Sequence, residues 1–337
     1  MSRPCYYHRH HYSTLSNVMR LDKQTRVCYT YIRGRTCTIK VREARVNDEE
    51  LLDYLAGYFD ANGCVTGKND TKEGPILWCN VSTLHLQTVE MFKQRFGGYM
   101  NVTHSPDKQY VSQKLIAKRT VYQWRVEYRR AVRFAQDIAP RAQLKKPQLE
   151  ILLALQQLKG SGQRVSSENK GQRIALLEQI RKYNQGLYAA SEYRISESLR
   201  LPYIAGYFDG DGCVTGQVQN NIAGARCNIC SADIELLSVL HNMFGGSIGK
   251  IFDVATNYTN RIGTHDVFQW QLSLNQSVPF ITAILPYLLV KKVQAQSLLE
   301  MASLRHDRKL SAKMPEETRI RRLTLLNTIK TANQTGS

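Results

Sequence analysis

Two short segments of the chain carry acidic residues and glycines at matching positions. The first reads LAGYFDANG at Leu55–Gly63, and the second reads IAGYFDGDG at Ile204–Gly212. Acidic side chains at the C-terminal end of a helix oppose the helix dipole, so two of them at one seam require a counter-charge. A divalent cation held by oxygen ligands would supply it. For one copy alone, a capping turn with a solvated aspartate is the alternative, but the pairing of the copies favours the metal. The glycines predict helix C-caps.

Both segments also place an Ala-Gly step inside an apolar helix. The steps are Ala56-Gly57 and Ala205-Gly206. Glycine in a helix interior costs about 1 kcal/mol relative to alanine, so another interaction must offset the loss. Close approach of two helix backbones is the usual reason, and it predicts that the two motif helices pack against each other.

The two segments belong to a longer internal repeat. Thirteen aligned positions, starting at Leu55 and Ile204, contain ten identities, and the likeness continues downstream at an offset of 146–149 residues. FGG at Phe96–Gly98, for example, recurs at Phe244–Gly246. Solenoids repeat every 20–50 residues or so, and this longer period indicates a duplicated domain. We expect a basic N-terminal extension at 1–46, a first domain at 47–190 with a flexible polar segment at 160–171, and a second domain at 191–337.

Each copy predicts the same order of elements. In the first copy we expect a helix over Asp48–Phe59, strands at Cys64–Lys68 and Ile76–Ser82, a helix ending near Phe96, and strands at Tyr99–His104 and Val121–Tyr128. Aromatic or apolar residues alternate with polar ones in the last strand, as expected when one face of a sheet is buried and the other is solvated. Helices from about Ala131, Gln148 and Arg173 follow, and the second copy opens with a helix over Ser196–Phe208. The order predicts an α+β fold of two tandem αββαββα repeats.

Composition narrows the class of protein. The chain has 46 Lys and Arg against 28 Asp and Glu, a net charge of +18, which favours nucleic acid over a membrane surface as the partner. The longest apolar run, Ile281–Val290, is too short to cross a bilayer. Eight cysteines in 337 residues do not resemble a disulfide framework and favour a reducing compartment. Cys227-x-x-Cys230 stands alone, so we do not expect zinc, and we expect Cys64 and Cys213 in the core.

The two motifs resemble the signatures of the LAGLIDADG homing endonuclease family in its two-motif, single-chain form. The resemblance spans about residues 47–337. It implies motif helices packed at the centre of a pseudo-two-fold monomer, whose two four-stranded sheets form a saddle on the major groove of a long, asymmetric double-stranded DNA site. It also implies Mg²⁺ as the cofactor, bound by the eighth motif residue, which is Asn62 in the first motif and Asp211 in the second.

The first motif departs from the family pattern because Asn62 replaces an acid. An amide oxygen can still ligate a cation, but it brings no charge, so the metal should bind more weakly. Phosphodiester hydrolysis uses the ion to generate hydroxide and to stabilise the leaving oxygen, and we therefore expect slow cleavage, nicking or none. Weakened natural chemistry, a natural protein that only binds, and a deliberate Asp-to-Asn change all stay open. We expect Asp60 and Asp209 to be structural hydrogen-bonding groups.

Two lysines form the second set of candidate catalytic residues. Lys145 and Lys291 each follow a proline by five residues, in the same place of both copies. The resemblance implies that a basic residue there steadies the attacking water or the charge on the phosphorane. A basic helix start that meets backbone phosphate is the other interpretation. Weaker candidates are Lys146 and Lys292 as alternates, and Thr83 and Ser231 as organisers of active-site water.

Polar side chains on the solvated faces of the predicted sheets would read the DNA. Gln, Asn, Arg and Lys can hydrogen-bond to base edges in the major groove. The predicted DNA-binding residues are Lys68, Asn80, Gln123, Arg125, Gln217, Gln219, Asn228, Lys250, Gln269 and Gln271, with Thr66 and Asn101 as further outward positions. Loops at 108–119 and 256–266 are expected to reach flanking phosphates. The basic charge predicts strongly salt-dependent binding.

The first 45 residues hold ten Lys and Arg against two acids. This composition fits an organelle-targeting presequence, which would place the protein in a chloroplast or mitochondrion rather than elsewhere inside the cell. A DNA-binding arm and a remnant of an upstream reading frame are the alternatives. Because hydroxyl residues are not dense there, an arm or extension is favoured.

Two functions of different classes are consistent with these patterns. The first is a Mg²⁺-dependent, sequence-specific DNA endonuclease of the homing type. The second is a nucleic-acid-binding protein that has lost the chemistry, such as an intron-splicing maturase or an RNA-associated structural protein, with RNA as its partner. Asn62 favours the second, whereas Asp211 and both lysines favour the first. A transcription regulator on the same fold is a third, weaker hypothesis.

Overall fold

The computed structural model describes residues 20–22, 27–32, 35–40, 47–70, 74–104, 119–158, 166–185, 194–252, 266–304 and 314–335. Residues 1–47 and 48–337 form two separate compact units. In the first unit, β1 (Arg20–Asp22), β2 (Val27–Ile32) and β3 (Arg35–Lys40) pair as an antiparallel sheet in the order β1-β2-β3. No prediction of secondary structure is made for this extension from the sequence.

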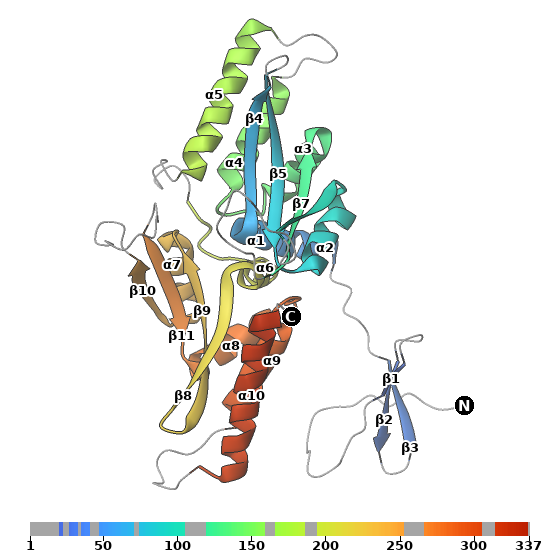
Figure 1. Ribbon diagram of the computed structural model, residues 1–337, viewed down its shortest axis with the longest axis vertical. Coiled ribbons are helices and arrows are strands. Elements are labelled where there is room, and N and C mark those ends of the chain that lie inside the picture. The colour runs from blue at the N-terminus through green and yellow to red at the C-terminus, as the bar shows by residue number, and fades with distance from the viewer. Residues whose placement is uncertain are drawn as a thin grey trace. The chain divides into compact units, whose positions relative to one another are not determined.

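The second unit contains the two repeats (Figure 1). The first consists of α1 (Asp48–Asn62), β4 (Gly63–Asp70), β5 (Gly74–Thr83), α2 (Leu86–Phe96), β6 (Tyr99–His104), β7 (Val121–Glu127), α3 (Tyr128–Ile138), α4 (Lys146–Gln157) and α5 (Ser167–Asn184). The second consists of α6 (Leu201–Asp211), β8 (Gly212–Gln219), β9 (Ile222–Ser231), α7 (Ile234–Phe244), β10 (Ser247–Phe252), β11 (Val267–Leu272), α8 (Leu274–Ile284), α9 (Lys292–Ser303) and α10 (Glu316–Thr335). Their antiparallel sheets have the equivalent orders β4-β5-β7-β6 and β8-β9-β11-β10. The predicted α+β fold of two tandem repeats is confirmed.

Two element boundaries differ from the sequence prediction. The segment 160–171 was expected to be flexible, but α5 already begins at Ser167, because Ser166 caps it by accepting a hydrogen bond from Asn169 N at 3.1 Å. The second motif helix begins at Leu201 rather than Ser196. Pro202 lies in its first turn, where a backbone N–H would have no partner within the helix, so proline is tolerated. Of the predicted joining segment Ala189–Ile195, residues 189–193 lie outside the described residues.

The two motif helices, α1 and α6, pack with their backbones in contact (Figure 1). A Cβ atom placed on Gly57 would lie 1.9 Å from the carbonyl oxygen of Tyr203, and one on Gly206 would lie 1.9 Å from that of Tyr54. No side chain fits at either position. The close approach predicted from the Ala-Gly steps is therefore confirmed, and it explains why glycine is placed inside an otherwise good helix.

Gly212 is the C-cap of α6, as predicted, and its backbone N–H donates to Phe208 O, but the glycines that end the motifs also have a packing role. Neither Gly63 nor Gly212 has a positive φ, so neither forms a left-handed C-cap. A Cβ on Gly63 would lie 2.2 Å from the ring of Phe59, and one on Gly212 would lie 2.2 Å from the ring of Phe208. These glycines thus allow the backbone to pass directly over a buried aromatic ring at the point where the motif helix ends and the first strand of the repeat begins.

The repeated FGG and Trp positions form one supporting unit in each repeat. The four glycines after Phe96 and Phe244 have φ values of 71°, 86°, 73° and 92°, a region that favours glycine. Trp124 Nε1 donates to Gly97 O, and Trp270 Nε1 donates to Gly245 O, both at 2.8 Å. Each tryptophan is fully buried. The turn therefore supplies the acceptor that a buried indole needs.

The last helix of each repeat is held by a buried arginine. Arg173 of α5 donates to the carbonyl oxygens of Leu155 and Pro75, and Arg322 of α10 donates to those of Ala223, Met301 and Leu304. These bonds join the helix to the far end of its sheet. No helix in the described part of the chain is long and apolar enough to cross a membrane.

Substituting Gly57 by alanine should destabilise the protein, although alanine is the better helix former. The added methyl group overlaps a backbone carbonyl, and overpacking of this kind costs about 1–3 kcal/mol. Gly171→Ala in α5 is the matched control, since its Cβ would meet nothing within 4 Å and should stabilise by roughly 0.4–1 kcal/mol. Urea unfolding measures both. Equal effects of the two variants would contradict the helix contact.

Candidate functional site

The leading aspartate of each motif is buried at the end of its helix and fully hydrogen-bonded. Asp60 accepts from the backbone N–H groups of Gln143, Leu144 and Lys145 at 2.6, 3.0 and 2.9 Å. Asp209 accepts in the same way from residues 289, 290 and 291 at 2.8, 3.0 and 2.8 Å. Each carboxylate thereby fixes the chain just before α4 or α9. The structural role predicted for the two aspartates is confirmed.

Tyrosine hydroxyls connect the two repeats at this level. Tyr203 of α6 donates to Asp60 Oδ2 at 2.8 Å, and Tyr54 of α1 donates to Asp209 Oδ2 at 2.9 Å. Each aspartate is thus satisfied partly by its own repeat and partly by the other. Burial of the two phenols, followed by the nearby carboxylates, holds their pKa values well above the usual range.

The two predicted lysines reach the C-terminal ends of the motif helices. Lys145 Nζ donates to Asp60 O, and Lys291 Nζ donates to Asp209 O and, at 3.5 Å, to Gly210 O. Desolvation by burial lowers the pKa of both ammonium groups, while Asp60, Asp209 and Asp211 oppose that shift. Both ammonium groups therefore lie beside the motif ends, where the sequence predicted them.

Asn62 and Asp211 lie at the tips of α1 and α6, which touch. A Cβ on Gly210 would lie 2.3 Å from Ala61 Cβ and 2.7 Å from Asn62 Nδ2. The Asp211 residue is exposed to solvent. Even so, desolvation by the surrounding protein raises the pKa of its carboxyl to about 6, and the charges of Lys145 and Lys291 oppose this shift. Within the described residues neither Asn62 nor Asp211 has a hydrogen-bond partner, so both side chains are available for a ligand.

The oxygen donors at these tips fit a divalent cation whose remaining coordination positions would be filled by the substrate. Among the described residues, no group of three His, Cys, Asp or Glu side chains could hold a metal by itself. One carboxylate, from Asp211, and one amide oxygen, from Asn62, are what the chain offers. Mg²⁺ keeps several waters and is commonly held by one or two carboxylates plus substrate phosphates, so the set is sufficient but weak.

Thr83 and Ser231 are the last residues of β5 and β9 rather than the first residues of the following helices. Both face the helix side of their sheets. The Thr83 hydroxyl contacts Tyr58 OH at 2.7 Å and accepts from His85 N at 3.2 Å, and Ser231 accepts from Tyr207 OH at 3.3 Å and Asp233 N at 3.0 Å. Their hydroxyls thus bond to tyrosines of α1 and α6 and to the backbone before α2 and α7, and a role in organising water stays a prediction.

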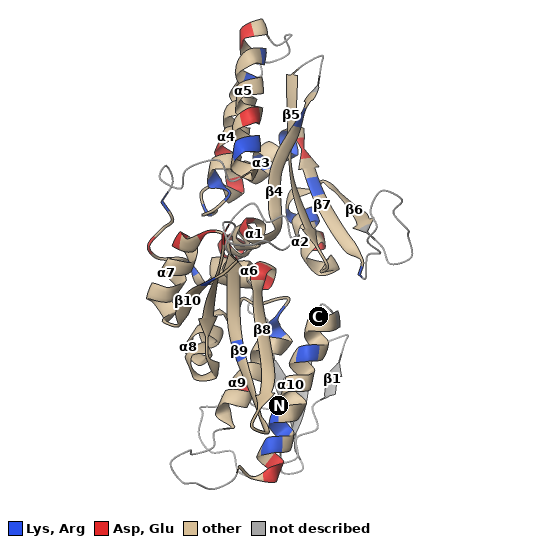
Figure 2. Ribbon diagram, turned by 60° about the vertical axis from the view of Figure 1, so that its left-hand side comes forward, with Lys and Arg blue, Asp and Glu red and all other residues tan. Residues whose placement is uncertain are grey.

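Most of the predicted DNA-binding residues share one face of each sheet. The buried face of β5 holds Leu77, Cys79 and Val81, and the opposite face pairs Asn80 with Arg125 across β5 and β7. In the first sheet this outward face carries Thr66, Lys68, Asn80, Asn101, Gln123 and Arg125, and in the second it carries Gln217, Gln219, Asn228, Gln269 and Gln271. β7 carries one basic residue, Arg125, and Figure 2 shows a basic position in this strand.

Lys250 is placed on the other face of the second sheet. The register pairs Gly249 with Gln269 and Lys250 with Phe268, so Lys250 lies on the helix side of β10 before a β-bulge. Its Nζ pairs with Asp266 at 2.7 Å. Asn228, although on the outward face, is only 9% exposed. The prediction for Lys250 is wrong because the one-residue shift reverses the direction of a strand side chain.

Sequence reasoning missed several outward residues that the alternation could have identified. Arg226 lies two residues before Asn228, is exposed, and donates to Gln271 Oε1 at 3.4 Å. Cys64 and Cys213 are half-buried rather than core, on the outward faces next to the motif tips. Burial raises the pKa of both thiols, and the neighbouring lysine opposes it.

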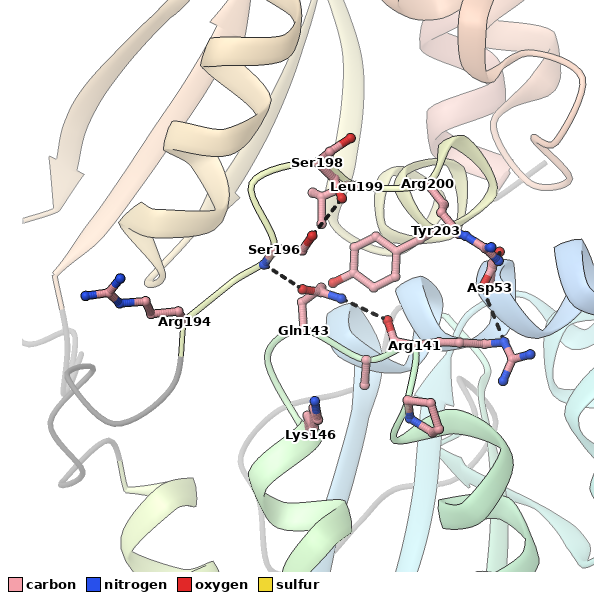
Figure 3. A pocket seen from close by; sticks show the side chains of 12 residues that line it. Asp53, Arg141, Gln143, Lys146, Arg194, Ser196, Ser198, Leu199, Arg200 and Tyr203 are labelled. Atoms are coloured by element: carbon pink, nitrogen blue, oxygen red, sulfur yellow. Dashed lines mark hydrogen bonds and ion pairs between the residues drawn. The ribbon is translucent and has the colours of Figure 1, made fainter.

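A pocket of about 380 Å³ lies beside α1 (Figure 3), and Asn62, Asp211, Lys145 and Lys291 are not among the residues that line it. The buried carboxylate of Asp53 pairs there with Arg141 Nε at 3.3 Å and Arg200 Nη1 at 2.9 Å. Gln143 Oε1 accepts from Ser196 N at 3.0 Å. These contacts attach the segment before α6 to the first repeat, so the pocket is best explained as part of the junction between repeats.

Comparison with known proteins agrees with this architecture. Residues 49–139 match the LAGLIDADG-like domain family. The crystal structure of I-LtrWI, a LAGLIDADG homing endonuclease bound to target DNA, is 13% identical with a TM-score of 0.61, covering 85% of this chain and 99% of that one. The meganuclease I-SmaMI bound to uncleavable DNA is 15% identical with a TM-score of 0.60, covering 86% and 100%. No curated protein sequence matches the chain significantly.

Residues 49–139 thus match the LAGLIDADG-like domain family, and both repeats together have the fold seen in the LAGLIDADG homing endonucleases I-SmaMI and I-LtrWI. The resemblance to that family predicted from the two motifs is confirmed. A further I-SmaMI structure, at 14% identity and a TM-score of 0.56, holds uncleaved DNA in the presence of calcium ions. At these identities the likeness defines the fold.

Removing the hydroxyl of Tyr203 should destabilise the junction of the repeats. Tyr203→Phe takes a charge-assisted hydrogen bond from buried Asp60, a loss of about 1.5–3 kcal/mol. Tyr207→Phe is the control on the same helix, because its hydroxyl contacts neutral Ser231 and should cost about 0.5–1.5 kcal/mol. Chemical denaturation compares the two. A larger loss in the control would contradict the assigned role of Tyr203.

Proposed function

We propose that the chain is a sequence-specific endonuclease that hydrolyses double-stranded DNA with the help of a divalent cation, Mg²⁺ being the expected one. The single observation that carries the proposal is the meeting of Asp211, Asn62, Lys145 and Lys291 at the tips of the packed motif helices. The fold, which I-SmaMI and I-LtrWI share in complex with DNA, supports the choice of substrate. The repeats contain both halves of the site, which is consistent with action as a monomer.

Asp211 and Asn62 would hold the cation together with phosphate oxygens of the substrate. When bound, the cation supplies activated water and stabilises charge on the leaving oxygen. The ammonium groups of Lys145 and Lys291 lie next to that charge and would favour the negative transition state. The buried aspartates keep those lysines in place by binding the backbone that carries them, so each fixed group is positioned before substrate arrives.

The outward faces of the two sheets would contact the bases. Their Gln, Asn, Arg and Lys side chains can donate to and accept from base edges in the major groove. The excess of basic residues would bind the phosphate backbone and make affinity fall steeply with salt. The two faces differ in sequence, which supports an asymmetric target.

A nucleic-acid-binding protein without cleavage is the second candidate, favoured by Asn62 alone. Asp211 contributes a carboxylate, whereas Asn62 contributes only an amide. The cation that acts on one DNA strand would therefore be held more weakly than the cation that acts on the other. This asymmetry supports nicking or slow cleavage if the enzyme acts. An intron-splicing maturase or RNA-associated protein would use the same surfaces with RNA. The host organelle stays a prediction from the basic N-terminal segment.

The test compares the chain with its Asp211→Asn and Asn62→Asp variants on a duplex selected from a randomised pool by binding to the full chain. With Mg²⁺, the unmodified chain should nick or slowly cut, and Asn62→Asp should cut both strands faster. Asp211→Asn should bind equally well but lose more than about 100-fold in rate, since loss of a supporting group alone costs about 10–100-fold.

Gel analysis of supercoiled plasmid carrying the selected site separates nicked from linear product. Tight, salt-dependent binding without cleavage by the chain or by Asn62→Asp would favour the binding protein. Tighter binding to the matching RNA than to the DNA would favour the maturase. Cleavage unaffected by Asp211→Asn would remove the proposed site.

A further inference from the structure

The outward face of the first sheet holds a cluster of four side chains, Trp78, Tyr99, Arg125 and Glu127. The Arg125 guanidinium carbon lies 3.8 Å from the centre of the Trp78 ring and 6.0 Å from that of Tyr99. Glu127 Oε1 pairs with Arg125 Nη2 and accepts from Tyr99 OH at 3.1 Å. The guanidinium is therefore fixed by stacking on the Trp78 ring and by the Glu127 carboxylate, which the Tyr99 hydroxyl holds in place.

Arg125 lies in the outward row of the sheet that starts at Cys64, two residues after Asn62 at the motif tip. The register runs Cys64, Asn80, Arg125 and Tyr99 across the four strands, and β4 begins directly after Asn62. All four residues are on the outward face, opposite buried Trp124 and Val126. Arg125 therefore belongs to the surface that the proposed function assigns to the DNA bases.

The cluster holds Arg125 without using all its donors. A guanidinium carries five N–H donors in a planar fork, and the contact with Glu127 engages Nη2. Within the described residues Nη1 has no partner, and the side chain is 25% exposed. A cation that is already ordered loses less side-chain entropy when it binds. The arrangement thus suits recognition of a base better than loose attraction to phosphate.

The second repeat lacks this cluster. At the positions equivalent to Trp78, Tyr99, Arg125 and Glu127 it carries Arg226, Ser247, Gln271 and Ser273. No ring and no carboxylate is present there, and Gln271 instead accepts a hydrogen bond from Arg226. The two faces must then read their half-sites differently at this position.

We propose that Arg125 reads a guanine in the half-site bound by the first repeat, with Trp78 and Glu127 as positioning residues. Arginine donating to guanine O6 and N7 is the commonest specific contact in the major groove. The inference rests on the proposed DNA binding. It adds that one base position depends on this one held side chain, and that the equivalent position of the other half-site is not read by an arginine at the place of Arg125.

The test is selection of binding sites from a randomised duplex pool by the full chain and by Arg125→Lys. The unmodified chain should select guanine at one position that Arg125→Lys then loses, with a fall in discrimination of about 10–100-fold. Because lysine keeps the charge, the dependence of affinity on salt should not change. Arg133→Lys is the matched control, an exposed arginine of α3 on the helix side of the sheet.

The positioning residues are tested by Trp78→Leu and Glu127→Gln, which should weaken discrimination at the same base position and at no other. Thermal unfolding of each variant checks that the fold is intact, since a merely structural role would lower stability without moving the base preference. An unchanged guanine preference in Arg125→Lys, or an equal loss at every position, would overturn the inference while leaving DNA binding intact. If the unmodified chain selects no sequence, the proposed function fails instead.

Discussion

The contact between the backbones of α1 and α6 is the constraint on which the rest of the structure depends. Gly57 and Gly206 each lie against a carbonyl oxygen of the other helix, where a Cβ would be 1.9 Å away. Only at this separation can Tyr203 reach Asp60 and Tyr54 reach Asp209. The same contact brings the helix tips together, so a packing requirement and the assembly of the site are one feature of the fold.

The scaffold of the molecule is symmetric, together with the two lysines, whereas the candidate metal ligands and the outward sheet faces are not. Both repeats keep the aspartate that binds three backbone N–H groups, the lysine that meets the helix end, and the tryptophan bonded to a glycine carbonyl. They differ at Asn62 and Asp211, and at the outward sheet faces. Both repeats need the same hydrogen bonds to fold, so these bonds are kept in each copy. An asymmetric DNA target, in contrast, requires the exposed side chains of the two copies to differ.

Much of this site could be predicted because each motif repeats at an offset that stays within 146–149 residues. The repeat identified Lys145 and Lys291 together, and helix propensity identified the reason for Gly57. Errors arose where one residue of register mattered. Lys250 faces the helices because of its pairing with Phe268, and Thr83, expected at a helix start, is instead the last residue of β5. Arg226 was missed although it lies on the same face as Asn228.

The sequence by itself determined the duplication, the α+β order, the packing of the motif helices and the set of residues at their ends. These properties follow from periodicity and from local backbone preferences, which act over a few residues. Only the tertiary structure decided which groups satisfy Asp60 and Asp209, which face each strand residue occupies, and that Arg125 is held by Trp78 and Glu127. Those outcomes depend on hydrogen bonds and strand registers between residues tens of positions apart, and no local pattern encodes them.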